Sequence, residues 1–305
     1  MALVNAINAY AYGQIDSAQR ALGLARASAV SNESNQLGLE AYRRMIEAGI
    51  GGRIMPERRS LVATLGYQEY LEKLIEYRSA NPALYAGDPT ARLHVVGDSH
   101  TLSPAHTRVS LDSIEHRVVA HPVIGAKAWH LAPDVNPAIT PQRKAFERLA
   151  TGLPAGEPTI AMFDEIDCRA SEGLFPFLDT HPEHDREQYC RGLAESYVGY
   201  LSATLRANER RIMVCGVPAP HPIQAHKVGE TSHLFVDLVR LFNRSLGEAA
   251  HEAGLVFLDS HNLTAADDGI ATGDRHLDTI HLLPAVFQEL LCAARSESGR
   301  YSTRL

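Results

Sequence analysis

The chain has 305 residues, of which 45% are apolar and 21% are charged, and its formal net charge at pH 7 is −7. This composition is typical of a globular protein with one large domain or two unequal ones. An acidic balance without a clustered basic face argues against DNA or RNA as a partner. The four cysteines lie far apart without C-x-x-C spacing, so we expect reduced thiols and neither a zinc ribbon nor a disulfide scaffold.

The N-terminus lacks the basic and apolar regions of a signal peptide. No later stretch approaches the ~18 apolar residues that a membrane span needs. We therefore expect a cytoplasmic protein that has no membrane partner.

The first 88 residues carry helical periodicity and no strand pattern. Apolar residues recur at helical spacing over three segments, namely 7–29, 36–48 and 59–77. Proline and glycine cluster at 81–89, which predicts a boundary near Asp88 between a helical extension (1–88) and a second domain (89–305). The extension faintly resembles one tetratricopeptide helix, but three self-similar copies are not found. Its expected roles are a cap on the second domain, a surface for homo-oligomers or a docking region for a partner protein.

From Arg92 onward, short β-branched runs alternate with long amphipathic segments. Strands are predicted at 93–96, 117–120, 159–163, 211–215 and 256–258. Helices are predicted at 141–150, 185–207, 228–253 and 284–294, with Pro141 and Pro284 in first turns and Gly254 after a helix end. The pattern predicts a three-layer α/β/α domain with a parallel sheet.

A serine follows the first predicted strand, in Val96-Gly97-Asp98-Ser99-His100. Because open α/β sheets gather their active sites at the carboxyl ends of strands, Ser99 is placed where a nucleophile works. A serine hydroxyl needs a base, and the base needs a carboxylate that fixes its tautomer. Asp278-Thr279-Ile280-His281 offers both groups just before the last helix, so we predict a triad of Ser99, Asp278 and His281. Either block alone is common as a turn or a helix cap.

The two blocks resemble those of the SGNH or GDSL hydrolases, which have Gly-Asp-Ser after strand one and Asp-x-x-His before the last helix. The resemblance covers about residues 92–295. It implies a flavodoxin-like parallel sheet and an ester hydrolase that uses no cofactor and no metal. Gly125, after the second predicted strand, resembles the glycine whose N–H joins that of Ser99 in the oxyanion hole; otherwise it is a turn glycine.

The third block of that family, Gly-x-Asn-Asp, corresponds here to Asp164-Glu165-Ile166-Asp167. Asp164 replaces the glycine and Ile166 replaces the asparagine, so a side-chain donor to the oxyanion is missing. Such a loss typically costs ~10²–10³ in rate. Arg169 is the nearest substitute donor, or a contact for an anionic substrate group; the alternative is a structural ion pair of Asp167 with Arg169.

Further residues near these blocks are predicted to bind substrate, namely Asp98, Trp129, Asp164, Asp167 and Arg169. Trp129 suits a sugar or an acyl group, or else it is a buried packing residue. No metal is predicted, because the metal-like run His181-Pro182-Glu183-His184 lies at a helix start where acidic residues need no ion. Cys168 is interpreted as a core thiol and not as a rival nucleophile.

These residues predict acyl transfer through an acyl-enzyme on Ser99, with O-acyl (for example acetyl) esters of a small molecule or a glycan as substrates. Two alternatives remain. One is an O-acyltransferase that uses the same triad in a drier cleft covered by the helical extension. The other is a non-catalytic binding module with an impaired oxyanion hole, against which the intact triad counts.

Overall fold

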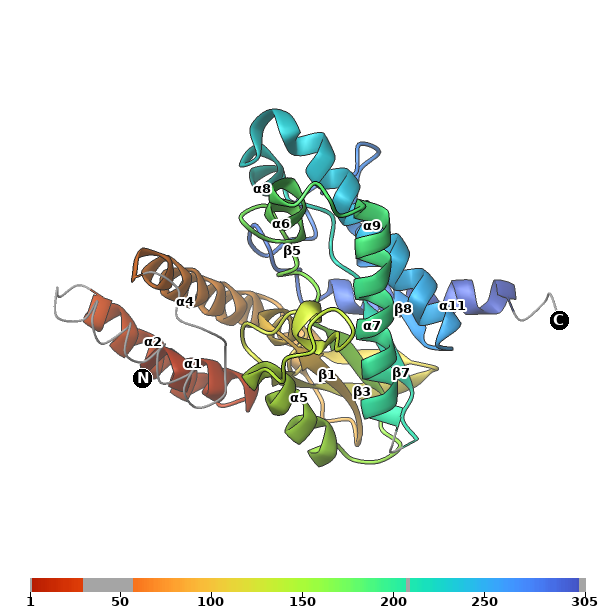
Figure 1. Cartoon of the computed structure of the whole chain (residues 1–305). Coiled ribbons are helices and arrows are strands. Elements are labelled where there is room, and N and C mark those ends of the chain that lie inside the picture. Colours follow the sequence, from red (N-terminus) through yellow and green to blue (C-terminus); the bar gives the residue numbers. More distant parts are fainter. Residues whose placement is uncertain (1, 30–56, 207–208, 302–305) are drawn as a thin grey trace.

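The structure is a computed structural model that describes residues 2–29, 57–206 and 209–301, with side chains over 2–25, 66–206 and 209–294 (Figure 1). The extension contains α1 (Ala2–Ala11), α2 (Ile15–Ala29) and α4 (Glu57–Ala80). The single helix predicted at 7–29 is divided, because Gly13 adopts a left-handed φ of 74° between α1 and α2. The helix predicted at 36–48 lies outside the described residues.

A six-stranded sheet forms the centre of the second part, in the order β2-β3-β1-β4-β7-β8. The strands are β1 (Ala91–Gly97), β2 (Arg108–Leu111), β3 (Ile114–Pro122), β4 (Thr159–Met162), β7 (Ile212–Cys215) and β8 (Val256–Leu258). All neighbouring pairs are parallel except β2 with β3. The carboxyl ends of the five parallel strands therefore share one edge of the sheet.

Helices cover both faces of this sheet (Figure 1). The helices on one face are α5 (Pro141–Gly152), α7 (Arg186–Arg206) and α9 (Ser232–Glu252). On the other face lies α11 (Val286–Tyr301), which begins two residues later than predicted, so Pro284 stands in the preceding turn. The predicted three-layer α/β/α class is confirmed.

Short elements complete the carboxyl edge. They are the ribbon β5 (Cys168–Arg169) with β6 (Glu172–Gly173), and the helices α6 (Leu174–Thr180), α8 (Pro222–His226) and α10 (Ser260–Thr264). The predicted helix at 228–253 begins only at Ser232, after a 3₁₀ turn over Gly229–Thr231.

Alternating residues along the strands feed two apolar cores, one on each face. On the α5/α7/α9 face the largest buried side chains are Phe146, Phe163, Tyr197, Phe235 and Phe242. On the α11 face the core includes Leu93, Val95, Met213, Phe287 and Leu290.

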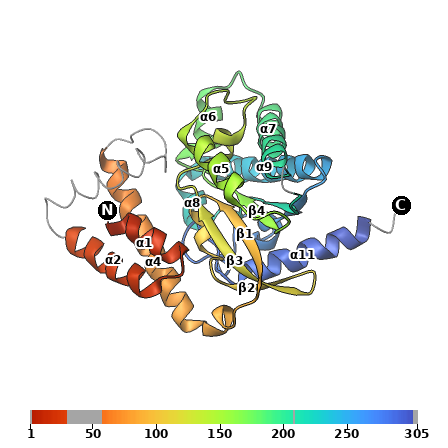
Figure 2. The ribbon, with the colours of Figure 1, turned by 90° about the horizontal axis from the view of Figure 1, so that it is seen from below.

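The helical extension packs on the sheet beside β1 and β3 (Figure 2). Its contact is a third apolar cluster, in which buried residues of α1, α2 and α4 meet residues that follow β1 and β3. The members of this cluster include Tyr10, Tyr70, Leu71, Leu102, Ala105, Ala120 and Ile124. Burial of these apolar side chains docks the extension on the second part of the chain.

The outer strand β2 is held by a side chain of α11. The Gln288 amide accepts the Ser110 N–H at 2.7 Å and donates to the Ser110 carbonyl at 3.3 Å. Both backbone groups of this edge residue are therefore paired.

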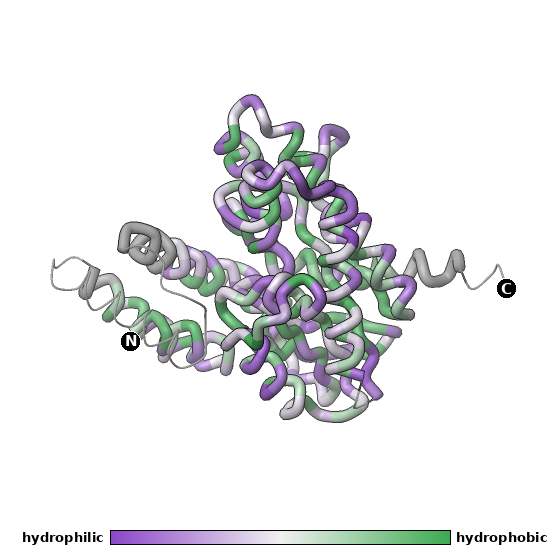
Figure 3. The backbone as a smooth tube through the Cα atoms, in the orientation of Figure 1, coloured by the Kyte–Doolittle hydropathy of each residue, from purple (hydrophilic) through white to green (hydrophobic). Residues whose placement is uncertain are grey.

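The long helices carry both hydrophilic and hydrophobic residues along their length (Figure 3). Among the residues that the structure describes, no helix is long and apolar enough to cross a membrane.

Candidate active site

The turn after β1 places Ser99 at the carboxyl edge of the sheet. Gly97 is required there, because a Cβ at this position would clash with the carbonyl oxygen of Met162 in β4. Asp98 then caps the 3₁₀ turn Ser99–Leu102, since its Oδ1 accepts the His100 N–H at 2.8 Å. The close contact of Gly97 with β4 and the capped turn that follows thus fix the position of Ser99.

The three residues predicted as a triad lie in one hydrogen-bonded chain. Ser99 Oγ is 3.0 Å from His281 Nε2, and His281 Nδ1 is 2.8 Å from Asp278 Oδ2. The other Asp278 oxygen accepts the N–H groups of Ile280 and His281, both at 2.7 Å. The carboxylate, fixed by its own loop, selects the tautomer in which Nδ1–H donates to Asp278 and Nε2 is free to accept from Ser99.

The charge states of this chain suit proton transfer. Burial lowers the pKa of His281 below its usual value, so the imidazole is neutral at pH 7. Burial alone would raise the pKa of Asp278, but His281 and the two backbone donors hold it well below its usual range. A neutral imidazole therefore stands between the Ser99 hydroxyl and the ionised Asp278 carboxylate.

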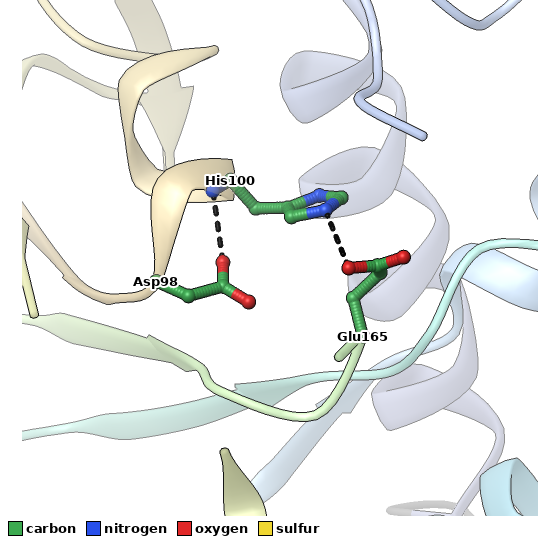
Figure 4. Close-up of side chains that lie close together, drawn as sticks. All are labelled: Asp98, His100 and Glu165. Atoms are coloured by element: carbon green, nitrogen blue, oxygen red, sulfur yellow. Dashed lines mark hydrogen bonds and ion pairs between the residues drawn. The ribbon is translucent and has the colours of Figure 1, made fainter. Parts of the chain in front are cut away.

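A second charged chain lies beside the first (Figure 4). His100 Nε2 is 3.4 Å from Glu165 Oε2, and the His100 ring centroid is 4.6 Å from that of His281. Arg169 Nε donates to both Glu165 oxygens, at 2.8 and 3.1 Å. Burial would raise the pKa of Glu165, but Arg169 and His100 hold it well below its usual range. Burial would lower the pKa of His100, yet Asp98 and Glu165 raise it overall, so a charge is stabilised one ring away from the base.

Arg169 does not pair with Asp167, contrary to the ion-pair alternative. Its guanidinium binds Glu165 on one side and Glu172 at 3.2 Å on the other. Asp167 instead accepts the backbone N–H of Ala128 at 2.7 Å, with a longer contact of 3.4 Å to the N–H of Trp129. Asp167 and Arg169 thus each have structural partners. The four-residue spacing from Glu165 to Arg169 is the feature of the sequence that could have predicted their ion pair.

Three of the residues predicted to bind substrate are buried carboxyls, namely Asp98, Asp164 and Asp167. Burial raises the pKa of Asp98 to about 6, that of Asp167 to about 7 and that of Asp164 well above its usual value. The Oδ2 atoms of Asp98 and Asp164 have no hydrogen-bond partner in the described part of the chain. None of the three lines the cavity near the triad.

Asp98, His100 and Glu165 also offer ligand atoms within 4.8 Å of one another, the spacing of a metal site. The Arg169 guanidinium, however, stands 2.7 Å from the same Glu165 oxygen that a metal would need. Because this cation already balances Glu165, the cluster is accounted for as an ion-pair network.

A small cavity adjoins the triad loop. Thr279 and Ile280, between Asp278 and His281, form part of its wall. Polar lining comes from Arg169, His221, Gln224 and His276, and apolar lining includes Val217 and Phe235. Its lining combines polar and apolar groups, as in sites that bind small molecules.

Gly125 lies in the loop after β3, with a left-handed φ of 72°. The loop is joined to the end of β1, because Val123 N–H donates to the Gly97 carbonyl at 2.6 Å. Ile166 is buried where the resembled family has a polar donor. Trp129 is 38% exposed, so it is not the buried packing residue of the alternative, but it does not line the cavity.

Ser99 and His281 are covered by the helical extension. Ser99 is 1% exposed and His281 is 7% exposed. Tyr70 of α4 stacks on the His281 ring with centroids 3.5 Å apart and an interplanar angle of 10°. Tyr70 and Glu165 were not predicted at the site, because nothing in local spacing links them to the triad, whereas His100 directly follows Ser99 in the sequence.

Neither the protein-family models nor the curated proteins give a match. Solved structures with a similar arrangement include a putative platelet activating factor from Streptococcus pneumonia, with 14% identity, 79% of this chain and 97% of that chain covered, and a TM-score of 0.43. A GDSL-like lipase from Bacteroides thetaiotaomicron has 12% identity and a TM-score of 0.40, with 74% of this chain and 98% of that chain covered. The M. smegmatis aryl esterase has 16% identity and a TM-score of 0.37, with 69% of this chain and 99% of that chain covered. At such identities and TM-scores the likeness does not assign an activity, whereas the contacts of Ser99 bear on one directly.

Proposed function

We propose that the protein is a serine-dependent ester hydrolase of the SGNH/GDSL type. The observation that carries this proposal is the chain from Ser99 Oγ through the His281 ring to Asp278, with both hydrogen bonds at 3.0 Å or less. A buried neutral imidazole beside a serine hydroxyl has the geometry and the charge state of a general base.

The reaction follows from these contacts. His281 Nε2 takes the proton of Ser99 Oγ as this oxygen attacks the ester carbonyl, and Asp278 stabilises the imidazolium. His281 then protonates the leaving alcohol, which leaves an acyl group on Ser99. Water, deprotonated by His281, attacks the carbonyl of this acyl-enzyme. The bond from Ser99 Oγ to the acyl carbon then breaks, His281 returns the proton to Ser99 Oγ, and the acid is released. The backbone N–H groups of Ser99 and Gly125 are the proposed oxyanion donors.

The cavity beside the triad loop supports a small O-acyl ester, for example an acetyl ester, as the substrate class. Its mixed polar and apolar lining suits the alcohol part of such an ester. His221, Gln224 and Thr279 offer hydrogen bonds to hydroxyl groups, and Phe235 offers an apolar wall. We therefore place the alcohol part of the ester in this cavity.

A fluorophosphonate probe and a short-chain aryl ester test the proposal together. The probe should label the folded protein at Ser99, and Ser99→Ala and His281→Ala should each lower ester turnover at least ~10³-fold. Folded wild-type protein that stays unlabelled, or Ser99→Ala protein that keeps its turnover, would contradict the hydrolase. The former result would favour the non-catalytic module, for which the buried Ile166 at the position of a polar donor is the supporting observation.

One observation favours a second candidate, an O-acyltransferase. Ser99 and His281 are almost fully buried under α4, and a covered acyl-enzyme is protected from water. Supplying alcohols or sugars together with the aryl ester and measuring the product partition separates the two activities. Acylated alcohol that dominates over free acid at millimolar acceptor would replace the hydrolase by the transferase.

A further inference from the structure

Helix α4 of the extension brings a tyrosine ring onto the proposed base. Tyr70 is fully buried, and its ring lies 3.5 Å from that of His281 in a nearly parallel stack. The His281 ring also meets that of His100, at a centroid distance of 4.6 Å and a tilt of 39°. The imidazole thus contacts one ring of the extension and one ring that follows Ser99.

The Tyr70 hydroxyl reaches the nucleophile turn as well. It donates to the Ser99 carbonyl at 3.2 Å and lies 2.7 Å from Ser103 Oγ. Burial raises the pKa of Tyr70 well above its usual value, so the group remains a neutral phenol. A single side chain of α4 therefore contacts both the base and the turn that carries the serine.

We propose that Tyr70 is a positioning residue for the reaction, and that the helical extension is for this reason part of the catalytic unit. The ring keeps the His281 imidazole in the plane that joins Asp278 to Ser99, and the hydroxyl fixes the Ser99 backbone. This inference rests on the proposed function, because it gives Tyr70 a task in the proton transfer at Ser99.

The stack acts mainly when charge develops. The face of an aromatic ring attracts a cation, and more strongly where water is excluded. His281 becomes a cation only when it takes the serine proton, so contact with Tyr70 stabilises the transition state more than the resting enzyme. The titratable groups that face His281 are Asp278 of its own loop, His276, His100 of the nucleophile turn, and Glu165 after β4. All four remain in place when Tyr70 alone is changed.

Two substitutions separate the ring from the hydroxyl. Tyr70→Phe keeps the stacked ring and removes the hydrogen bonds to Ser99 and Ser103. Tyr70→Leu keeps an apolar cover that excludes water, but removes the ring face. The matched control is Tyr10→Leu, because Tyr10 is equally buried in the same apolar cluster and meets His106 edge-on at 6.2 Å.

The readout is an NMR titration of the His281 ring, whose signal is identified by its loss in His281→Gln. Tyr70→Leu should lower the pKa of His281, since the imidazolium loses its ring contact, and should lower kcat about tenfold with little change in KM. Tyr70→Phe should keep the His281 titration and lose at most about threefold in kcat. Tyr10→Leu should lower the melting temperature and leave the titration unchanged.

A His281 titration that is identical in wild type and folded Tyr70→Leu would overturn the inference. If Tyr70→Leu does not fold, Tyr70→Met fills the space with another ringless side chain and takes its place. Failure of wild-type protein to react with the fluorophosphonate would reject the proposed hydrolase instead, while the titration would still show whether Tyr70 stabilises the charged imidazole.

Discussion

One carboxylate, Asp278, determines whether His281 can serve as a base. Asp278→Asn should lower kcat about 10⁴-fold, because an amide no longer selects the tautomer with Nδ1–H toward residue 278. Loss of the anion also disfavours the imidazolium, so the pKa of His281 should fall and the acidic limb of the rate profile should move to lower pH. The measurement is the pH dependence of aryl-ester turnover.

The matched control is Asp274→Asn, which removes an exposed carboxylate from the same loop. This variant should keep the wild-type rate and profile. An Asp278→Asn enzyme within tenfold of wild type would show that another group orients His281.

Among single residues, the sequence identified those whose partners are near in the chain or stand in recognisable blocks. Asp278 and His281 are three residues apart, and Ser99 closely follows the end of a strand, so the local pattern was sufficient to predict them. Tyr70 and Glu165 contact the site only because α4 and the loop after β4 fold onto it. The apolar periodicity of the sequence does not indicate contacts between such distant parts of the chain. The pairing of Arg169 with Asp167 was wrong because two glutamates compete for the guanidinium.

At the scale of an element, the 3₁₀ turn Ala128–Leu131 depends on Asp167. Asp167→Ala should lower the free energy of unfolding by about 1–3 kcal/mol, because the buried Ala128 N–H loses its acceptor. Asp167→Asn keeps an acceptor oxygen and should be milder. Denaturant unfolding at pH 7 measures both.

Asp179→Ala, at an exposed position near the end of α6, serves as the control for loss of a carboxylate. If Asp167→Ala is as stable as this control, the contacts to Ala128 and Trp129 do not hold the turn.

The elements that the sequence predicted well are those with strong periodic patterns, such as β1, β4, α5 and α7. The missed strand β2 is short and follows a turn-rich segment. It joins β3 through Asp112 and Ser113, both at positive φ, and this pair is a weak hairpin signal compared with Asn-Gly. The break between α1 and α2 likewise depends on one residue, Gly13, which does not interrupt the helical periodicity of the sequence around it.

At the scale of the whole molecule, the layer order followed from the alternation of strands and helices. The docking of the extension did not, because its cluster unites Leu71 and Tyr70 with Leu102, Ala105 and Ile124 from a distant part of the chain. Apolar faces in the sequence show that helices pack, but not on what they pack.

Half-buried neutral histidines should make the fold sensitive to acid. Burial lowers the pKa of His121 to about 4, as it does for His130 and His276. Because the pKa of each histidine is lower in the folded state than the usual 6.5, its contribution to the free energy of unfolding is complete above pH 6.5. That contribution is lost as the pH falls toward 4. The raised pKa values of Asp98 and Asp167 act in the opposite sense. His121→Gln should therefore flatten the fall of the melting temperature between pH 7.5 and 5.

Thermal unfolding across this pH range measures the effect. His184→Gln, at an exposed position, should keep the wild-type pH dependence and serves as the control. Equal slopes for wild type and His121→Gln would show that His121 does not contribute to acid sensitivity.

The contact of the Gln288 amide with β2 bears on whether molecules associate through the edges of their sheets. An outer strand with unpaired N–H and C=O groups is a template on which a second chain can add its own strand. Here a helix side chain occupies both groups of Ser110, as a neighbouring strand would. We therefore expect Gln288 to oppose edge-to-edge addition of molecules at high concentration, since it leaves neither backbone group of Ser110 free to pair with a second chain.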